Sequence, residues 1–213
     1  MVESKNPYYA ADYDDLIRFI TYYHQIDLIR RLGVRELLEV GCGNRTVSAY
    51  LGWHGVKVIT CDLDADLRPD VVGDIRHLPF KADSFEAAAA FEVLEHLPWE
   101  QVDAALKELH RVSRHYVVLS VPYLPLYFEM VVRFPLLRQM AGRPYLDLFV
   151  GLPFSCFRRC SPSHHWELGL PGYSLRRFRR KLMSFFRIER ELRPVLHPLH
   201  RLFVLTKCPE KDS

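Results

Sequence analysis

The seven residues 39–45, Glu-Val-Gly-Cys-Gly-Asn-Arg, constrain the fold of this chain more than any other stretch. They follow an apolar run, 34–38, that predicts a buried strand, and they precede residues 46–51, which predict the first turns of a helix. Closely spaced glycines at such a junction let the backbone turn sharply and let a ligand lie against bare main chain at the positive end of the helix. This arrangement is typical of the nucleotide-binding turn of doubly wound α/β folds, although a turn that binds nothing is an open alternative.

The following segments supply a second indication. Residues 56–61 predict a strand that ends on Asp62, about 20 residues after the glycines, where a carboxylate can accept both ribose hydroxyls of a nucleoside. Segments 71–86 come next, and then the box Phe-Glu-Val-Leu-Glu-His-Leu at 91–97. In order and spacing, residues 34–121 resemble the class I S-adenosylmethionine-dependent methyltransferases, specifically the type 11-like group with a Glu-x-Gly-Cys-Gly turn and a Glu-Val-Leu-Glu-His box. A nicotinamide-dependent dehydrogenase would carry Gly-x-Gly-x-x-Gly instead.

The resemblance implies S-adenosyl-L-methionine as the cofactor and assigns its contacts. Glu39, Gly41 and Gly43 would hold the methionine end, with Glu39 facing the ammonium, and the main chain of Ala90 and Phe91 would meet the methionine amine. Asp62 would take the ribose hydroxyls, and Leu63 would lie against the adenine. Asp74 would accept from the adenine amino group beside the Ile75 backbone. Arg45 departs from the pattern, because the family often has a third glycine there. Its cation either pairs with the cofactor carboxylate or points outward.

The same segments predict an α/β fold that is Rossmann-like: a doubly wound, seven-stranded, mostly parallel sheet with an antiparallel last strand and an apolar insertion after strand five. Strands are expected near 35–40, 56–61, 70–73, 86–91 and 115–121, helices near 45–53 and 99–112, and a closing antiparallel pair at 185–190 and 202–206. One domain is expected, with an N-terminal helical lid (1–33), a cofactor-binding half (34–121), an acceptor-side insertion (122–173) and a closing helix with antiparallel strands (174–213).

The N-terminal segment predicts a helix whose apolar residues recur at helical spacing and which stops at Gly33. One interpretation is a lid over the cofactor that is closed by Tyr8, Tyr9 or Tyr13. The other is a helix packed on one face of the sheet. Both stay open from the sequence.

The composition of the chain limits the cellular locations that are expected for it. The chain has no apolar run of 18 residues and no secretory leader, so it is expected neither to span a membrane nor to be secreted. Its five cysteines are odd in number, which suits reduced thiols better than a disulfide framework. The expected location is the cytoplasm, with peripheral contact at a membrane as an option.

The insertion contains two strongly apolar pieces, 123–140 and 145–154, with Arg133, Arg138 and Arg143 between apolar residues. Such a segment suits a pocket for an apolar acceptor or a surface that docks on anionic headgroups. A helical cap over the domain and a dimer contact are equally open. Pro125 and Pro135 interrupt any single helical period.

The stretch 164–169, His-His-Trp-Glu-Leu-Gly, comes before a predicted helix that Ser174 caps. Related methyltransferases place a similar stretch in the acceptor-facing loop. A neutral histidine can take a proton from a hydroxyl or amine, so His164 or His165 is the predicted catalytic base and Glu167 its orienting partner; a purely structural loop is the alternative. No metal is expected, because Cys156, Cys160 and the two histidines lack the usual knuckle spacing. Glu95-His96 is interpreted as ordering a turn.

Two functions remain in view. The first is a methyltransferase for a small-molecule or lipid-like acceptor, and the second is a non-catalytic adaptor for a membrane or partner, working through the basic, apolar second half. Glu39, Asp62 and Asp74 favour the enzyme, because an adaptor has no chemical need for ribose- and adenine-facing acids. The arginines at 176–193 predict a solvated helix face more often than an RNA site, so nucleic acid is not an expected partner.

Overall fold

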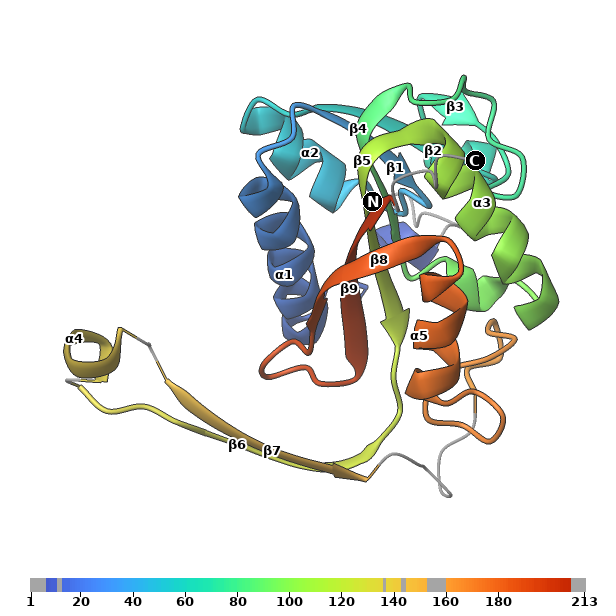
Figure 1. The fold of residues 1–213 in the computed structure, drawn as a ribbon. Coiled ribbons are helices and arrows are strands. Elements are labelled where there is room, and N and C mark those ends of the chain that lie inside the picture. The colour runs from blue at the N-terminus through green and yellow to red at the C-terminus, as the bar shows by residue number, and fades with distance from the viewer. Residues whose placement is uncertain (1–6, 11–12, 136, 143–144, 153–159, 208–213) are drawn as a thin grey trace.

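The computed structural model describes residues 7–10, 13–135, 137–142, 145–152 and 160–207. Within these ranges, seven strands form one sheet in the order β3-β2-β1-β4-β5-β9-β8 (Figure 1). Their bounds are β1 Glu36–Val40, β2 Lys57–Asp62, β3 Val71–Val72, β4 Phe85–Phe91, β5 Ser113–Pro122, β8 Phe186–Leu192 and β9 His200–Lys207. Strands β1 to β5 pair in parallel, and β9 runs antiparallel to both β5 and β8. The predicted doubly wound sheet with an antiparallel last strand is confirmed.

Helices cover both faces of this sheet. Figure 1 places α1 (Leu16–Leu32) and α2 (Thr46–Trp53) on one side and α3 (Val102–Val112) and α5 (Leu175–Met183) on the other. The alanine run of β4 alternates accordingly: Ala87 and Ala89 pack in the core under α1 and α2, while Ala88 and Ala90 pack in the core under α3 and α5. Alternation along a strand explains why a wholly apolar run serves a sheet that is buried on both faces. Short 3₁₀ turns connect the elements at Pro7–Tyr9 (η1), Ala65–Leu67 (η2), Leu94–His96 (η3) and Trp99–Gln101 (η4).

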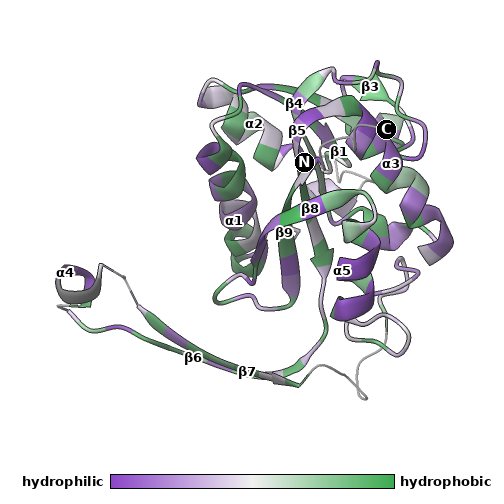
Figure 2. Cartoon of the chain, in the orientation of Figure 1, coloured by the Kyte–Doolittle hydropathy of each residue, from purple (hydrophilic) through white to green (hydrophobic). Residues whose placement is uncertain are grey.

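Helix ends follow the residues that the sequence supplies. Gly33 ends α1 in the left-handed region with φ 68°, and its N–H donates to the Arg30 carbonyl. Ser174 begins α5 by accepting a hydrogen bond from the Arg177 N–H at 3.2 Å. The outward face of α5 is strongly hydrophilic (Figure 2), as expected for a solvated face.

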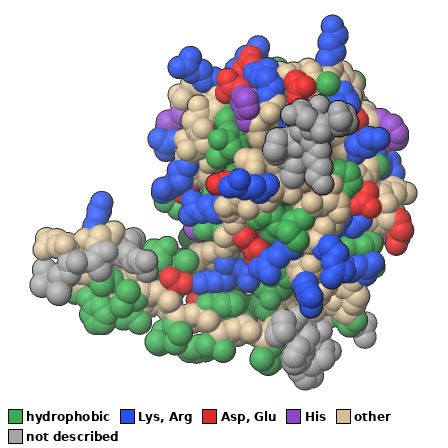
Figure 3. Space-filling view, in the orientation of Figure 1, with side chains coloured by type: hydrophobic (Ala, Val, Ile, Leu, Met, Phe, Trp, Pro, Cys, Tyr) green, Lys and Arg blue, Asp and Glu red, His purple; other side chains and the backbone are tan. Residues whose placement is uncertain are grey.

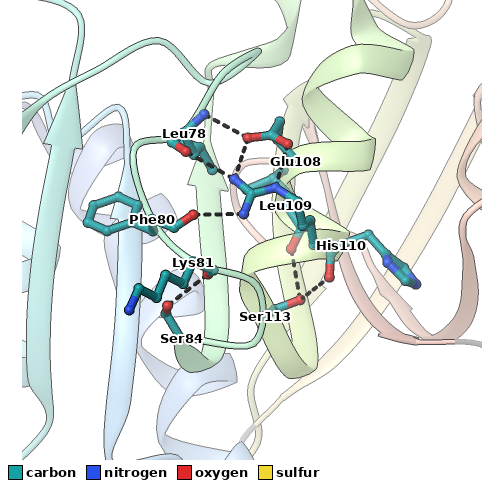
Figure 4. A network of polar contacts seen from close by, with 9 residues as sticks. Leu78, Phe80, Lys81, Ser84, Glu108, Leu109, His110 and Ser113 are labelled. Carbon is teal, nitrogen blue, oxygen red and sulfur yellow. Dashed lines mark hydrogen bonds and ion pairs between the residues drawn. The ribbon is translucent and has the colours of Figure 1, made fainter.

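A polar network ties the loop after β3 to α3 (Figure 4). The Glu108 carboxylate accepts from the Leu78 N–H at 2.8 Å and pairs with Arg111 through two contacts of 2.7 Å. Arg111 also donates to the carbonyls of Leu78 at 3.0 Å and Phe80 at 2.7 Å. Three backbone groups of the loop are therefore satisfied by one ion pair, and the loop is held against α3.

The insertion after β5 is a two-stranded hairpin, named here the hairpin arm. Its strands β6 (Leu126–Val132) and β7 (Leu146–Leu152) pair antiparallel, and a short helix α4 (Leu137–Ala141) lies between them in the chain. The arm projects from the body of the molecule (Figure 1), and hydrophobic side chains follow it (Figure 3). The helical cap considered from the sequence is therefore wrong for the described part of this segment. Period-two alternation in each strand, rather than a 3.6-residue period, is the pattern that the structure uses.

The two faces of the hairpin arm differ in composition. One face carries cross-strand pairs that are apolar throughout, and these are Leu126–Leu152, Phe128–Val150, Met130–Leu148 and Val132–Leu146. All of these side chains except Val132 are exposed. On the other face, Arg193 of the body pairs with Glu129 at 2.5 Å and Asp147 at 2.6 Å, and its guanidinium lies 4.2 Å from the centre of the Phe149 ring. This second face is therefore attached to the body, and within the described part of the chain the apolar face is left uncovered.

Candidate active site

A cavity of about 870 Å³ opens at the carboxyl ends of β1, β2 and β4, lined by residues from all three strands and from the N-terminal segment. This is the edge at which doubly wound sheets bind their ligands. Its size falls within the roughly 300–1,000 Å³ that is usual for ligand pockets.

The structure gathers nearly all of the predicted cofactor residues around this cavity. Those that line it are Glu39, Gly41, Gly43, Asp62, Leu63, Asp74, Ile75 and Phe91. Ala90 is the exception: it is fully buried within β4 and its side chain packs in the core below α3 and α5. A contact from Ala90 would have to come through its main chain, as the resemblance implies.

The backbone of the glycine turn leaves little room for side chains. Gly41 has φ 78°, and a Cβ built there would come within 2.2 Å of a Val93 methyl group, so a side chain is excluded by both backbone and space. Gly43 has φ 49°, and the Tyr8 ring lies 3.3 Å from the place of its missing Cβ. The turn therefore offers bare main chain to a ligand and is covered on one side by an aromatic ring.

Arg45 occupies the third-glycine position without changing the turn. Its φ of 64° lies in the left-handed region that glycine adopts freely, so the arginine follows the backbone path that the family glycine would take. Its guanidinium donates to the Arg68 carbonyl at 2.8 Å and contacts Asp70 at 3.4 Å. The outward orientation is the one observed, and Arg45 is not among the residues that line the cavity.

Glu39 is the residue predicted to face the cationic end of the cofactor. It is buried, and its Oε2 has no hydrogen-bond partner within the described part of the chain. Burial raises the pKa of Glu39 to about 8, and contacts with Ser48 and the charge of Arg45 offset only part of this. A buried carboxyl group with one unpartnered oxygen beside the glycine turn suits an ammonium ligand, because the ion pair would satisfy that oxygen.

The two acids that are predicted to face the nucleoside, Asp62 and Asp74, are held in place by their neighbours. Asp62 ends β2 and accepts the Asp64 N–H at 3.0 Å. Asp74 accepts from the Arg76 guanidinium and from the Arg76 N–H at 2.8 Å, and these contacts lower the pKa of Asp74. Asp74 is therefore an ionised acceptor at neutral pH. Leu63 is 70% exposed, as an adenine-covering side chain at the rim of an open pocket would be.

The N-terminal segment lies beside this half of the cavity. Tyr8 and Tyr13 both line it and contact each other edge-on at 5.1 Å between ring centres, and Arg18 lies 3.9 Å from the centre of the Tyr13 ring. Tyr9 is exposed and is not among the lining residues. The lid interpretation stays a prediction, with Tyr8 and Tyr13 as the residues positioned for it.

The end of the cavity where the acceptor is predicted to bind, named here the acceptor end, is built from two segments that are distant in sequence. Residues Glu92, Glu95 and His96 follow β4, and His164 approaches them from the loop before α5. Trp166, fully buried, fixes that loop by donating from Nε1 to the Leu97 carbonyl at 3.0 Å. The loop therefore closes this end of the cavity.

The structure distinguishes between the two predicted catalytic histidines. His164 Nδ1 lies 2.6 Å from Glu167 Oε1, and the same oxygen accepts the Ser161 N–H at 2.9 Å. The Glu167 side chain is buried beneath His164. His165 is exposed and does not line the cavity; its N–H donates to the Glu95 carbonyl at 2.8 Å. Of the two histidines, His164 alone faces the cavity.

Sequence reasoning did not single out a second set of titratable groups at this end. Glu92 has φ 56° and pairs with His200 of β9 at 2.8 Å, and His197 also lines the cavity. Burial raises the pKa of Glu92, but the charge of His200 and a hydrogen bond to it outweigh burial, so the net shift is downward. Burial and then the adjacent Glu92 raise the pKa of Glu95. No local signal could have joined β9 to the box at 91–97.

Comparison with known proteins agrees with this geometry. The family model described as "Methyltransferase domain" matches residues 38–120. The chain has a class I S-adenosylmethionine-dependent methyltransferase domain. A comparison with curated protein sequences found no match. When bound, S-adenosylmethionine supplies a methyl group on a sulfonium sulfur that is already activated, so the protein must mainly position the acceptor and exclude water.

Solved structures share the whole fold of this methyltransferase at low identity. Magnesium protoporphyrin IX methyltransferase from Synechocystis with bound S-adenosylhomocysteine is 15% identical, with a TM-score of 0.62 over 94% of this chain and 91% of that one. The 1,6-didemethyltoxoflavin-N1-methyltransferase of Burkholderia thailandensis is 15% identical, with a TM-score of 0.58 over 92% and 82%. The N-methyltransferase NodS of Bradyrhizobium japonicum is 12% identical, with a TM-score of 0.58 over 97% and 94%. The likeness concerns the fold alone.

Proposed function

We propose that this methyltransferase modifies a lipid-like acceptor that it takes from an anionic membrane surface. The apolar face of the hairpin arm carries this proposal. Exposed apolar patches of this kind mark interaction surfaces, and this one includes Phe128, Met130 and Val150. No helix among the described residues is long and apolar enough to cross a membrane, so contact would be through such a surface.

Two further observations support a membrane as the partner. Arg133 and Arg138 are exposed between the two strands of the arm, where they can meet anionic headgroups while the apolar face enters the interface. The arm also begins shortly after Pro122, which lines the cavity at the carboxyl end of β5. A docked arm would therefore bring the acceptor end of the cavity close to the lipid surface.

At that end we assign His164, held by Glu167, as the group that faces the acceptor. His164 lines the cavity, and its contact with a buried carboxylate fixes the orientation of the ring. Because the methyl group is already activated, a fixed polar contact that aligns the acceptor is the main requirement. His165 has no role in this proposal.

Vesicle sedimentation combined with labelled methyl transfer tests the proposal. The protein is expected to bind vesicles containing anionic lipid and to bind less as salt rises, since headgroup attraction is screened. Phe128→Asp with Val150→Asp, a cross-strand pair on the apolar face, should abolish binding. Trp53→Asp is the matched control, because Trp53 is also a large exposed apolar side chain but lies outside the arm.

Labelled methyl groups from S-adenosylmethionine should then appear in the lipid fraction of a cell extract. Absence of vesicle binding, together with turnover of a polar acceptor, would contradict the proposal. A dimer in sedimentation velocity that the same double substitution dissociates would assign the apolar face to a second copy of the chain.

A further inference from the structure

Three side chains at the acceptor end of the cavity bring metal-ligating atoms together. One carboxylate oxygen of Glu95 and one imidazole nitrogen from each of His96 and His164 lie within 4.8 Å of one another. Glu95 and His96 belong to η3, directly after β4, whereas His164 comes from the loop before α5. Glu95 and His96 lie far in sequence from the cysteines and histidines at 156–165, so local spacing does not predict this cluster.

Hydrogen bonds set both histidines in the same tautomer. His96 Nδ1 lies 2.9 Å from the Ser163 carbonyl, and His164 Nδ1 lies 2.6 Å from the Glu167 carboxylate. Carbonyl and carboxylate oxygens only accept, so Nδ1 carries the hydrogen in each ring, and in the neutral imidazole Nε2 keeps its lone pair. A carbonyl or carboxylate behind Nδ1 is the usual support of a metal-binding imidazole, because it fixes the ring and makes Nε2 more basic.

Glu95 supplies the second, independent observation. Its side chain is fully buried, and within the described part of the chain neither carboxylate oxygen has a hydrogen-bond donor. Buried polar groups are nearly always paired, and an orphaned carboxylate calls for an explanation such as an ion. Both oxygens belong to the residue that already meets the two imidazoles.

We propose that Glu95, His96 and His164 bind one divalent transition-metal ion of the zinc type. Two imidazoles and a carboxylate are the protein ligands of many catalytic zinc sites, and this donor set favours zinc and its first-row neighbours over magnesium or calcium. Ligands about 2.0–2.2 Å from a tetrahedral ion lie about 3.3–3.6 Å from each other, so binding would draw the three side chains inward. The fourth position would face the cavity, where the acceptor enters.

The ion would activate an acceptor hydroxyl. Coordination lowers the pKa of a bound hydroxyl, so its proton leaves to solvent. The acceptor oxygen then forms its new bond to the methyl carbon, while the carbon–sulfur bond breaks and its electron pair stays on sulfur. Lewis-acid activation would make His164 a ligand rather than a base. This step rests on the proposed acceptor, whereas metal binding by the free protein does not.

Metal titration of the full chain tests the site without cofactor or acceptor. Protein freed of metal by a chelator is titrated with Co²⁺, followed by its d–d absorption, and then with Zn²⁺ to displace it. One equivalent should bind. Glu95→Gln and His164→Ala should each weaken binding at least 100-fold, and Glu167→Gln should weaken it about 10–100-fold by removing the support behind His164.

His165→Ala is the matched control, since this neighbouring histidine lies outside the cavity and should leave Co²⁺ binding unchanged. An unchanged circular dichroism spectrum shows that each variant is folded. Failure of the wild type to bind one saturable equivalent would overturn the proposal. So would Glu95→Gln and His164→Ala variants that bind Co²⁺ as the wild type does.

Discussion

Cofactor binding should release a proton from Glu39. Burial raises the pKa of this carboxyl to about 8 in the free protein. At pH 7 about nine-tenths of the Glu39 side chains are therefore protonated, and at pH 9 about one-tenth. The resemblance to other class I methyltransferases implies that this carboxylate faces the cofactor ammonium. A cation next to a carboxylate favours its ionised form. Binding at pH 7 is then expected to release about 0.9 proton, and binding at pH 9 about 0.1.

The sign of the pH dependence follows from the same shift. Below pH 8 the free protein must lose a proton before the ion pair forms, so affinity should rise up to about tenfold per pH unit and level off above pH 8. The stability of the free protein changes with pH in the opposite direction. Because the folded-state pKa lies above the unfolded one, the contribution of Glu39 is full below the unfolded pKa and is lost as pH rises through about 8.

Calorimetry at fixed pH in buffers of different ionisation enthalpy measures the released proton directly. S-adenosylhomocysteine is the ligand, and the slope of observed enthalpy against buffer enthalpy gives the proton number. Glu39→Gln should reduce the release to near zero. Glu36→Gln is the control, because Glu36 lies on the same strand but pairs with Arg114 outside the cavity. A wild-type slope near zero at pH 7, or the same slope in Glu39→Gln, would refute the reasoning.

Three further substitutions test the nucleoside side and the fold. Asp62→Ala should weaken S-adenosylhomocysteine by about 2–3 kcal/mol through loss of charged hydrogen bonds, and unchanged affinity in calorimetry would remove Asp62 from the site. Glu108→Gln should lower the free energy of unfolding in urea by about 1–2 kcal/mol, because it weakens the network on α3. Glu100→Gln, at an exposed position, is the control and should not lower it. Equal urea midpoints for the two variants would contradict this prediction. Arg45→Gly should leave cofactor affinity unchanged, since the side chain points to Asp70, and a loss of more than tenfold would contradict that orientation.

The sequence by itself determined the sheet and the cofactor half. Strand, glycine turn and helix are contiguous, so the turn at Gly41 and Gly43 and the acid at Asp62 could be predicted from local pattern and spacing. Helix ends at Gly33 and Ser174 follow from single residues for the same reason. Each of these features depends on residues that are close in the chain.

Tertiary structure decided the features that depend on residues far apart in the chain. The direction of Arg45 was settled by the carbonyl of Arg68 and by Asp70, which only the packing of β2 against its following loop brings near. The approach of His164 to Glu95 and His96 depends on the loop at 161–168 folding back over the end of β4. The spacing of two residues along the sequence does not predict such a contact, because the path of the long segment that joins them is set by the packing of the whole sheet.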